Sequence, residues 1–171
     1  MKPFLYSSYR CPQRIVDVVG FHLIELDRDG GGRKGERNMA IRNLTMGDCM
    51  SQVPVTIDAG LTMDDAAQRM FDHKIRHLPV VDRGHLVGVV SERDLAMIDS
   101  IPNVDRQSMS VATAMSSNPY TCSKATPLVE VVDTMADQKI GTAIVMESGK
   151  IVGIFTTIDA LRYLADALRG K

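Results

Sequence analysis

Hydrophobic positions along the chain recur in two similar stretches, and each stretch begins with a short apolar segment followed by an amphipathic helix. The apolar segments cover residues 54–57 and 119–122. In the helices, apolar side chains spaced by one and four positions form a single face. The face residues are Ala66, Ala67, Met70 and Phe71 in the first stretch and Val131, Val132, Met135 and Ala136 in the second.

Two strand-like runs follow each of these helices, at 78–81 and 86–90 and again at 143–146 and 151–155. A Gly-containing turn, at 83–84 or 148–149, joins each pair of runs and predicts a hairpin. A further helix is predicted at 92–98 and at 157–168. Each stretch therefore predicts a strand, helix, strand, strand, helix unit of roughly 50 residues, which is small for an independent core.

A shift of 65 positions superimposes the two units without a gap. Between residues 50–94 and 115–159, 13 of 45 aligned positions are identical, where ordinary composition would give about 3. We therefore expect an α/β fold of two tandem repeats, at 44–100 and 109–168, that pack through their sheets as a pseudo-twofold pair. Residues 1–39 contain three consecutive glycines among alternating charges, and we expect them to form a flexible extension.

The composition narrows the classes of function. The formal net charge is −1 and aromatic residues make up only 5% of the chain, so neither nucleic-acid binding nor attraction to an anionic membrane is expected. Polar and charged residues interrupt the apolar stretch at 15–26, so we expect neither a membrane span nor the core of a signal peptide there. The three cysteines are widely spaced and fit neither a disulfide framework nor a metal pair, so we expect a cytoplasmic protein.

Both hairpins run into the same phrase at the start of a helix: Gly, two apolar residues, Ser or Thr, two variable residues and Asp. The phrase pairs Ser91 with Asp94 and Thr156 with Asp159. A first helical turn also gathers free backbone N–H groups and the positive end of the helix dipole, which favour a phosphate. An ionised carboxylate accepts hydrogen bonds, as the two hydroxyls of a ribose require.

The same phrase is also the pattern of a capping box, in which Ser or Thr and an acid three residues later only satisfy the start of a helix. A duplicated structural unit duplicates its caps as well. The presence of the phrase in both repeats therefore does not separate a ligand site from a cap, and the sequence leaves both interpretations open.

Residues 74–82 read Lys-Ile-Arg-His-Leu-Pro-Val-Val-Asp, and Gly84 and the phrase ending at Asp94 follow. This run resembles a cystathionine-β-synthase (CBS) domain, and the second repeat is similar to one more loosely. Two such domains in tandem resemble a Bateman module, over about residues 44–168. The resemblance implies a pseudo-twofold pair with two clefts that bind adenosine compounds such as AMP, ADP, ATP or S-adenosylmethionine.

By this resemblance, the Ser/Thr-x-x-Asp phrase of one repeat holds ribose and phosphate, and the opening and pre-hairpin segments of the other repeat flank the adenine. One expected cleft combines Thr156 and Asp159 with Val53, Val55, Ile75 and Arg76. The other combines Ser91, Arg93 and Asp94 with Asn118, Tyr120, Ile140 and Gly141. Arg76 in one cleft and Arg93 in the other supply charge to a phosphate, whereas their repeat counterparts Gly141 and Ile158 do not. The two clefts are therefore expected to be chemically unequal.

The resemblance implies a regulatory protein that forms a homodimer, binds an adenosine nucleotide between its repeats and signals occupancy to a regulated protein by a conformational change. The last helix carries an apolar stripe that either faces a partner subunit or packs against its own repeat. The stripe consists of Ile158, Leu161, Leu164 and Leu168. The alternative function is a ligand-independent dimerisation or interaction module whose phrases are only caps.

Neither a catalytic nor a metal site is expected. His73, His77 and His85 lie close in sequence but have no matching cysteine or carboxylate at the spacing of a metal site. Ser91 lacks a base that a third group would orient. We therefore expect no enzyme activity and no obligatory cofactor.

Overall fold

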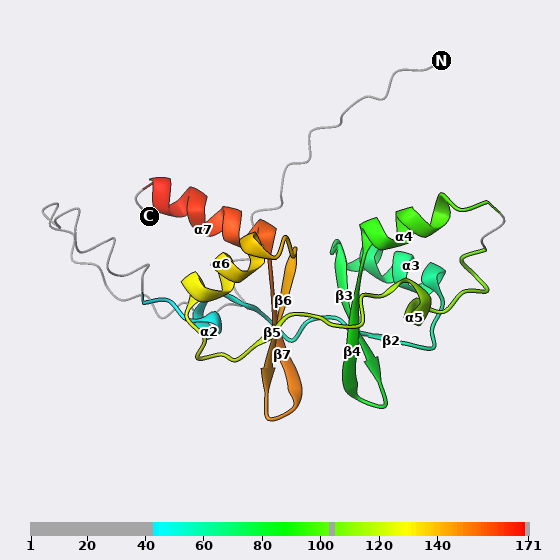
Figure 1. Ribbon diagram of the computed structural model, residues 1–171, viewed down its shortest axis with the longest axis horizontal. Helices are drawn as coiled ribbons and strands as arrows, with labels where there is room; N and C mark the ends of the chain where they lie inside the picture. The colour runs from blue at the N-terminus through cyan, green and yellow to red at the C-terminus, as the bar shows by residue number, and fades with distance from the viewer. Residues whose placement is uncertain (1–42, 103–104, 170–171) are drawn as a thin grey trace, which may run out of the picture. The chain divides into compact units, whose positions relative to one another are not determined.

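Two β-hairpins with helices packed beside them make up the part of the chain that the computed structural model describes, residues 43–102 and 105–169 (Figure 1). The extension expected at 1–39 lies outside the described residues. The elements of the first repeat are α2 (Met46–Cys49), β1 (Ser51–Gln52), β2 (Ile57–Asp58), α3 (Met63–His73), β3 (His77–Asp82), β4 (His85–Ser91) and α4 (Glu92–Asp99). Those of the second are α5 (Val111–Ala114), β5 (Thr121–Cys122), α6 (Leu128–Asp137), β6 (Thr142–Glu147), β7 (Lys150–Thr156) and α7 (Thr157–Arg169). The predicted element order is confirmed, with a short helix added at the start of each repeat.

Two-residue turns close both hairpins. Arg83 and Gly84 have φ values of 48° and 82°, and Ser148 and Gly149 have φ values of 49° and 76°. Two successive residues with positive φ define the type I′ turn, whose twist matches that of the flanking strands. Gly at the second position adopts this conformation without a steric cost.

Short strands from earlier in each repeat extend the hairpins. β2 runs parallel to β3, so that Ile57 pairs with Val80, and β5 runs parallel to β6, so that Thr121 pairs with Ile144. Both hairpins also shift register at one point along their first strand. The repeat seen in the sequence is therefore also a repeat in strand pairing.

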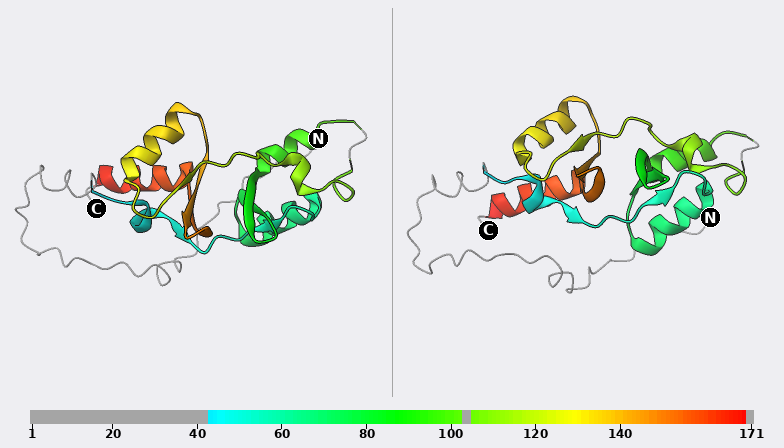
Figure 2. Two further views of the ribbon diagram at one scale, coloured as in Figure 1. Left: turned by 60° about the horizontal axis from the view of Figure 1, so that its bottom comes forward. Right: turned by 90° about the horizontal axis from the view of Figure 1, so that it is seen from below.

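The opening segment of each repeat crosses to the other repeat. β1 pairs antiparallel with β7, with Ser51 opposite Ile154, and gives a sheet of order β1-β7-β6-β5. In the second repeat the equivalent residue, Ser116, forms an antiparallel bridge with Val89 of β4. The short helices also pack against the other repeat, since α2 contacts α6, and α5 contacts α3 and α4 (Figures 1 and 2).

Each of the two hydrophobic cores consequently contains side chains from both repeats. Met46 and Met50, from the opening segment of the first repeat, are buried in the core around Phe155. Val111, from the opening segment of the second repeat, is buried in the core around Leu78. Because neither core is complete without the other repeat, the two repeats pack as one unit.

Glycines allow the crossing segments to come close to the hairpins. A β-carbon on Gly88 would lie 2.8 Å from the carbonyl oxygen of Ser116, and one on Gly153 would lie 2.8 Å from Cγ of Met50. Both distances are shorter than real β-carbon contacts. A β-carbon at Gly88 would therefore push the backbone of the opening segment of the other repeat away from the sheet, and one at Gly153 would force the Met50 side chain to move.

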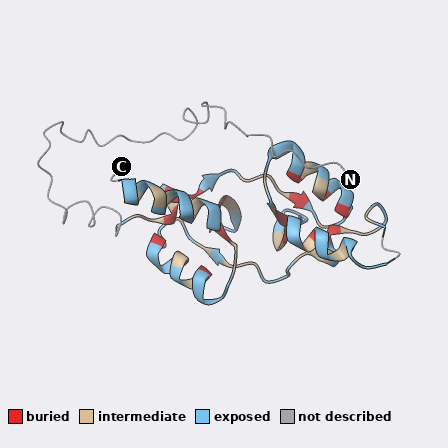
Figure 3. Cartoon of the chain, turned by 90° about the horizontal axis from the view of Figure 1, so that it is seen from above, coloured by how far each residue is buried: buried red, intermediate tan, exposed pale blue. Residues whose placement is uncertain are grey.

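The predicted helix faces are confirmed at their centres and wrong at their last position. Ala66 and Met70 of α3 are buried, as are Val131 and Met135 of α6. Phe71, however, is 79% exposed, because five residues beyond Ala66 the helix has turned about 140° past a whole turn, away from the sheet. Figure 3 shows the buried positions of these helices facing inward.

None of the described helices has the length and apolarity that crossing a membrane requires.

Candidate functional site

Four helices of the described chain begin with the same cap. In each cap, the backbone N–H and the hydroxyl of a Ser or Thr donate to one oxygen of an Asp three residues later, over 2.8–2.9 Å and 2.7 Å. The pairs are Thr45 and Asp48, Thr62 and Asp65, Ser91 and Asp94, and Thr156 and Asp159. The capping interpretation is confirmed for both phrases, so the phrase alone does not identify a ligand site.

The Ser91–Asp94 cap differs from the cap at Thr62 because it lies in a cleft of about 490 Å³ that both repeats line. This volume is typical of a small-molecule site. All seven residues that the sequence analysis assigned to one cleft line it: Ser91, Arg93, Asp94, Asn118, Tyr120, Ile140 and Gly141. The structure thus brings this predicted set together.

Backbone hydrogen bonds hold the walls of the cleft in place. The N–H of Glu92, at the start of α4, donates to the carbonyl of Arg76 over 3.0 Å. From the second repeat, Ser116 and Val89 exchange two backbone hydrogen bonds of 2.9 and 3.0 Å. This bridge carries the segment that contains Tyr120 across to the first repeat.

Three cationic side chains line the cleft, and all three residues are exposed: Arg76, Arg93 and Lys139. Within residues 43–102 and 105–169, none of them forms an ion pair. The carboxylates in the lining are those of Glu92 and Asp94. The family resemblance implies that Arg76 belongs to the other cleft, whereas in the structure Arg76 lines this one, as Arg93 does.

His77 is a half-buried member of the lining. Burial holds the pKa of its imidazole below the usual value, which the carboxylates of Asp94 and Glu92 oppose and the guanidinium of Arg76 reinforces. The imidazole is therefore neutral near pH 7. A neutral imidazole thus lines the cleft together with the three cationic side chains.

Thr142, the repeat counterpart of His77, also lines the cleft and is 6% exposed. Its hydroxyl oxygen is buried and has no hydrogen-bond partner among the described residues. The two repeats approach each other closely here, since a β-carbon on Gly141 would lie 3.5 Å from Nε2 of His77.

The other predicted set is distributed differently. Thr156 and Asp159 cap α7, while Val55 and Ile75 pack against the core of the first repeat. Val53 is 84% exposed and donates its N–H to the carbonyl of Val152 over 3.2 Å. A ligand role for these residues stays a prediction.

His77, Lys139 and Glu92 line the cleft but are not among the residues predicted for it. Each of them adjoins a predicted site residue, so a wider window around Arg76, Ile140 and Arg93 would have included them. No group of three or more His, Cys, Asp or Glu side chains with a metal-binding arrangement occurs in the part of the chain that the structure describes.

Comparison with known families decides which fold family is present. The model of the CBS domain matches residues 46–100 and again residues 111–166, which together are more than half of the chain. The chain belongs to the CBS domain family. Domain pairs of this family are typically regulatory rather than catalytic.

Solved CBS domain pairs resemble this chain over most of their length. The CBS domain pair of protein MJ0100, in complex with 5′-methylthioadenosine and S-adenosyl-L-methionine, is 26% identical, with a TM-score of 0.65 and coverage of 72% of this chain and 97% of that one. CBSX2 in complex with AMP is 27% identical, with a TM-score of 0.64 and coverage of 72% and 97%. These neighbours bind adenosine ligands.

A curated relative, L-aspartate semialdehyde sulfurtransferase of Methanocaldococcus jannaschii, is 26% identical in an alignment of 164 residues that covers 91% of this chain and 31% of that protein. The chain spans less than half the length of the first curated relatives it matches. The similarity therefore concerns the CBS domain pair.

Proposed function

We propose that this protein is a regulatory sensor that binds an adenosine ligand in the cleft between its two CBS repeats. The observation that carries the proposal is the cleft itself, which gathers Ser91 and Asp94 of one repeat with Asn118, Tyr120 and Ile140 of the other. Adenosine ligands in the related domain pairs of MJ0100 and CBSX2 support it.

Each part of an adenosine ligand has a matching group in the cleft. One carboxylate oxygen of Asp94, Oδ2, accepts from Ser91, while Oδ1 has no hydrogen-bond partner within the described chain and can accept from a ribose hydroxyl. The half-buried side chains of Tyr120 and Ile140 offer apolar surface to an adenine ring. The N-terminus of α4 and its neighbouring cations favour negative charge.

Binding at this place is suited to regulation. Because both repeats line the cleft, a ligand contacts both and favours the packing of the repeats in which those contacts are best. The change in packing is the signal that a regulated protein would detect. The ligand is regulatory, so the proposal includes no obligatory cofactor and no catalysis.

Calorimetric titration with AMP, ATP and S-adenosylmethionine tests the proposal, using Asp94→Ala and Asp65→Ala as matched variants. Both variants remove the acid of a capping box and keep its Ser or Thr, so both should lower the stability of the protein. Only Asp94→Ala should weaken binding, by about tenfold or more, since it also removes a charged acceptor. Failure of the unmodified protein to bind any of the three compounds would overturn the sensor function and favour the interaction-module alternative.

Homodimer formation is the second part of the proposal. The apolar stripe of α7 does not pack against its own repeat, since Ile158, Leu161, Leu164 and Leu168 are 40%, 59%, 54% and 79% exposed. No residue of α7 is buried, as Figure 3 shows. An exposed apolar stripe of this length on one helix favours a second copy as its cover.

A further inference from the structure

We infer that the cleft selects adenosine ligands that carry phosphate over uncharged or cationic adenosyl compounds, and that each chain binds one such ligand. This inference rests on the proposed function and narrows it to a ligand class and a stoichiometry. The cleft is lined by cationic side chains, most of which have no counterpart at the equivalent positions of the other repeat.

The charge of the cleft favours an anion. Arg76 precedes β3, Arg93 lies in the first turn of α4, and Lys139 follows α6, so the three cations approach from both repeats. They face two carboxylates, and Asp94 already accepts two hydrogen bonds from Ser91. Guanidinium groups bind phosphate through paired hydrogen bonds, whereas a sulfonium would be repelled by them.

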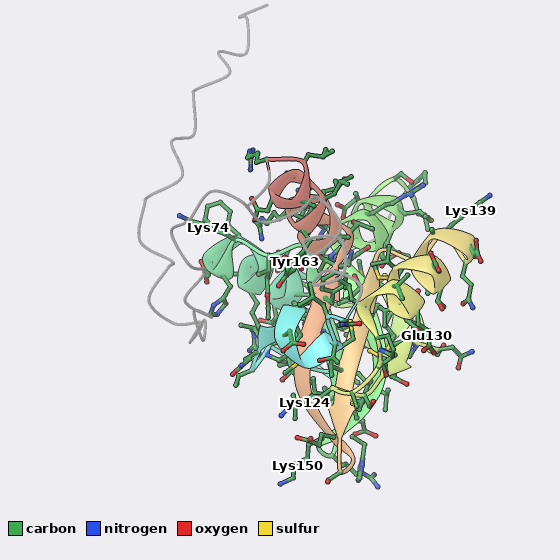
Figure 4. All side chains as sticks on the ribbon, turned by 90° about the vertical axis from the view of Figure 1, so that its left-hand side faces the viewer. Lys74, Lys124, Glu130, Lys139, Lys150 and Tyr163 are labelled. Carbon is green, nitrogen blue, oxygen red and sulfur yellow. The ribbon has the colours of Figure 1, made fainter. Side chains whose placement is uncertain are left out.

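The second repeat does not reproduce this set of charges. The shift of 65 positions replaces Arg76 by Gly141 and Arg93 by Ile158, so only Lys74 remains at the position that corresponds to Lys139. Lys74 and Lys139 lie on opposite sides of the described chain in Figure 4. A cleft built from the equivalent positions therefore has one of the three cations.

The carboxylate of the second phrase is also occupied. Oδ1 of Asp159 accepts from Arg162 over 3.1 Å, in addition to the cap at Oδ2. The residue that corresponds to Arg162 in the first repeat is Met97, which leaves Oδ1 of Asp94 without such a partner. The free ribose acceptor and the phosphate-binding cations thus coincide only in the cleft that contains Asp94.

Calorimetric titration of the full chain with AMP, adenosine and S-adenosylmethionine tests the inference. We expect one AMP per chain, bound roughly 10–100-fold more tightly than adenosine, since charge-assisted hydrogen bonds contribute most to this difference. Raising the salt concentration should weaken AMP binding and leave adenosine binding unchanged. Arg93→Gln should reduce AMP affinity by about tenfold or more, while Lys74→Gln, its control outside the cleft, should not change it.

The outcomes separate this inference from the function on which it rests. Adenosine or S-adenosylmethionine binding as tightly as AMP would overturn the phosphate selectivity and leave the sensor function standing. Two AMP molecules bound per chain with equal affinity, or equal effects of Arg93→Gln and Lys74→Gln, would overturn the single asymmetric site. Absence of binding by all three compounds would overturn both the inference and the proposed function.

Discussion

The carbonyl oxygen of Ser116 lies 2.8 Å from the point at which a β-carbon on Gly88 would stand. The backbones of the two repeats therefore meet at a glycine, where no side chain keeps them apart. We expect Gly88→Ala to lower the free energy of unfolding by about 1–3 kcal/mol, because the added methyl group displaces backbone that forms the Ser116–Val89 bridge. Urea denaturation measures the change.

The repeat counterpart provides the control for this prediction. Gly153→Ala meets mainly the side chain of Met50, whose flexible thioether can move more easily than a backbone carbonyl. Its cost should therefore be smaller than that of Gly88→Ala. A cost for Gly88→Ala below that of Gly153→Ala would contradict the role assigned to the Ser116 carbonyl.

Backbone strain at Val53 predicts a stabilising substitution. Val53 has a φ of 48° although it is β-branched, and its side chain is 84% exposed. Left-handed backbone costs such a residue roughly 1–2 kcal/mol, and Asn tolerates it better. Val53→Asn should raise the free energy of unfolding by about 1 kcal/mol in urea denaturation, and it introduces the residue that the second repeat has at Asn118.

Val53→Ala separates strain from hydrophobicity at this position. It removes the exposed apolar branches but keeps a β-carbon in the left-handed region, so it should gain less stability than Val53→Asn. Equal stabilisation by both variants would show that exposure, rather than backbone strain, limits stability there.

The neutral His77 imidazole predicts a loss of stability in mild acid. Burial lowers the pKa of His77 in the folded protein below its usual 6.5, so the unfolded chain binds the proton first as the pH falls. The free energy of unfolding should therefore be unaffected by this group above about pH 7 and should decrease between the unfolded and folded pKa values. Below the folded pKa the decrease should level off.

Urea denaturation of the ligand-free protein between pH 7.5 and pH 5.5 measures this dependence against His77→Gln, which should flatten the decrease. His85→Gln changes an exposed histidine and serves as the control. If the pH dependence of His77→Gln equals that of the unmodified protein, the decrease arises elsewhere.

The exposed stripe of α7 predicts a change in oligomeric state. Leu161→Asp places a charge within the stripe, so the variant should be monomeric by size exclusion with light scattering where the unmodified protein is dimeric. Phe71→Asp changes an equally exposed apolar residue on α3 and should remain dimeric. A monomeric unmodified protein, or a monomeric Phe71→Asp, would contradict the assignment of the dimer contact to α7.

Local patterns were sufficient to predict most of the fold. Apolar runs and Gly-containing turns predict both hairpins to within one residue at each end, because the type I′ turn at Gly84 and Gly149 has a recognisable sequence. The short helix α2 was not predicted, since four residues contain no helical periodicity. Its position depends on burial of Met46 in the other repeat, which no local pattern reports.

Seven of the residues that line the cleft could be predicted from the sequence, but the number of cationic side chains in it could not. Ser91, Asp94 and Tyr120 were assigned to one cleft from the repeat and the family resemblance, and they line it together. Arg76 was assigned to the other cleft because sequence order cannot show that the starts of β3 and β6 lie against each other. Thr62 and Asp65 have the same Thr-x-x-Asp spacing and form the same cap, yet they do not line the cleft, so this spacing alone does not predict a site.

The exchange of opening segments constrains how this chain arose. A single repeat would leave Met46 and Met50 without the core that buries them and would leave its own core open where Val111 now lies. Such a half-length ancestor could have been stable only as a symmetric pair of identical chains. Within one chain the two halves need not be identical, and Arg76 and Arg93 of one half stand where the other has Gly141 and Ile158.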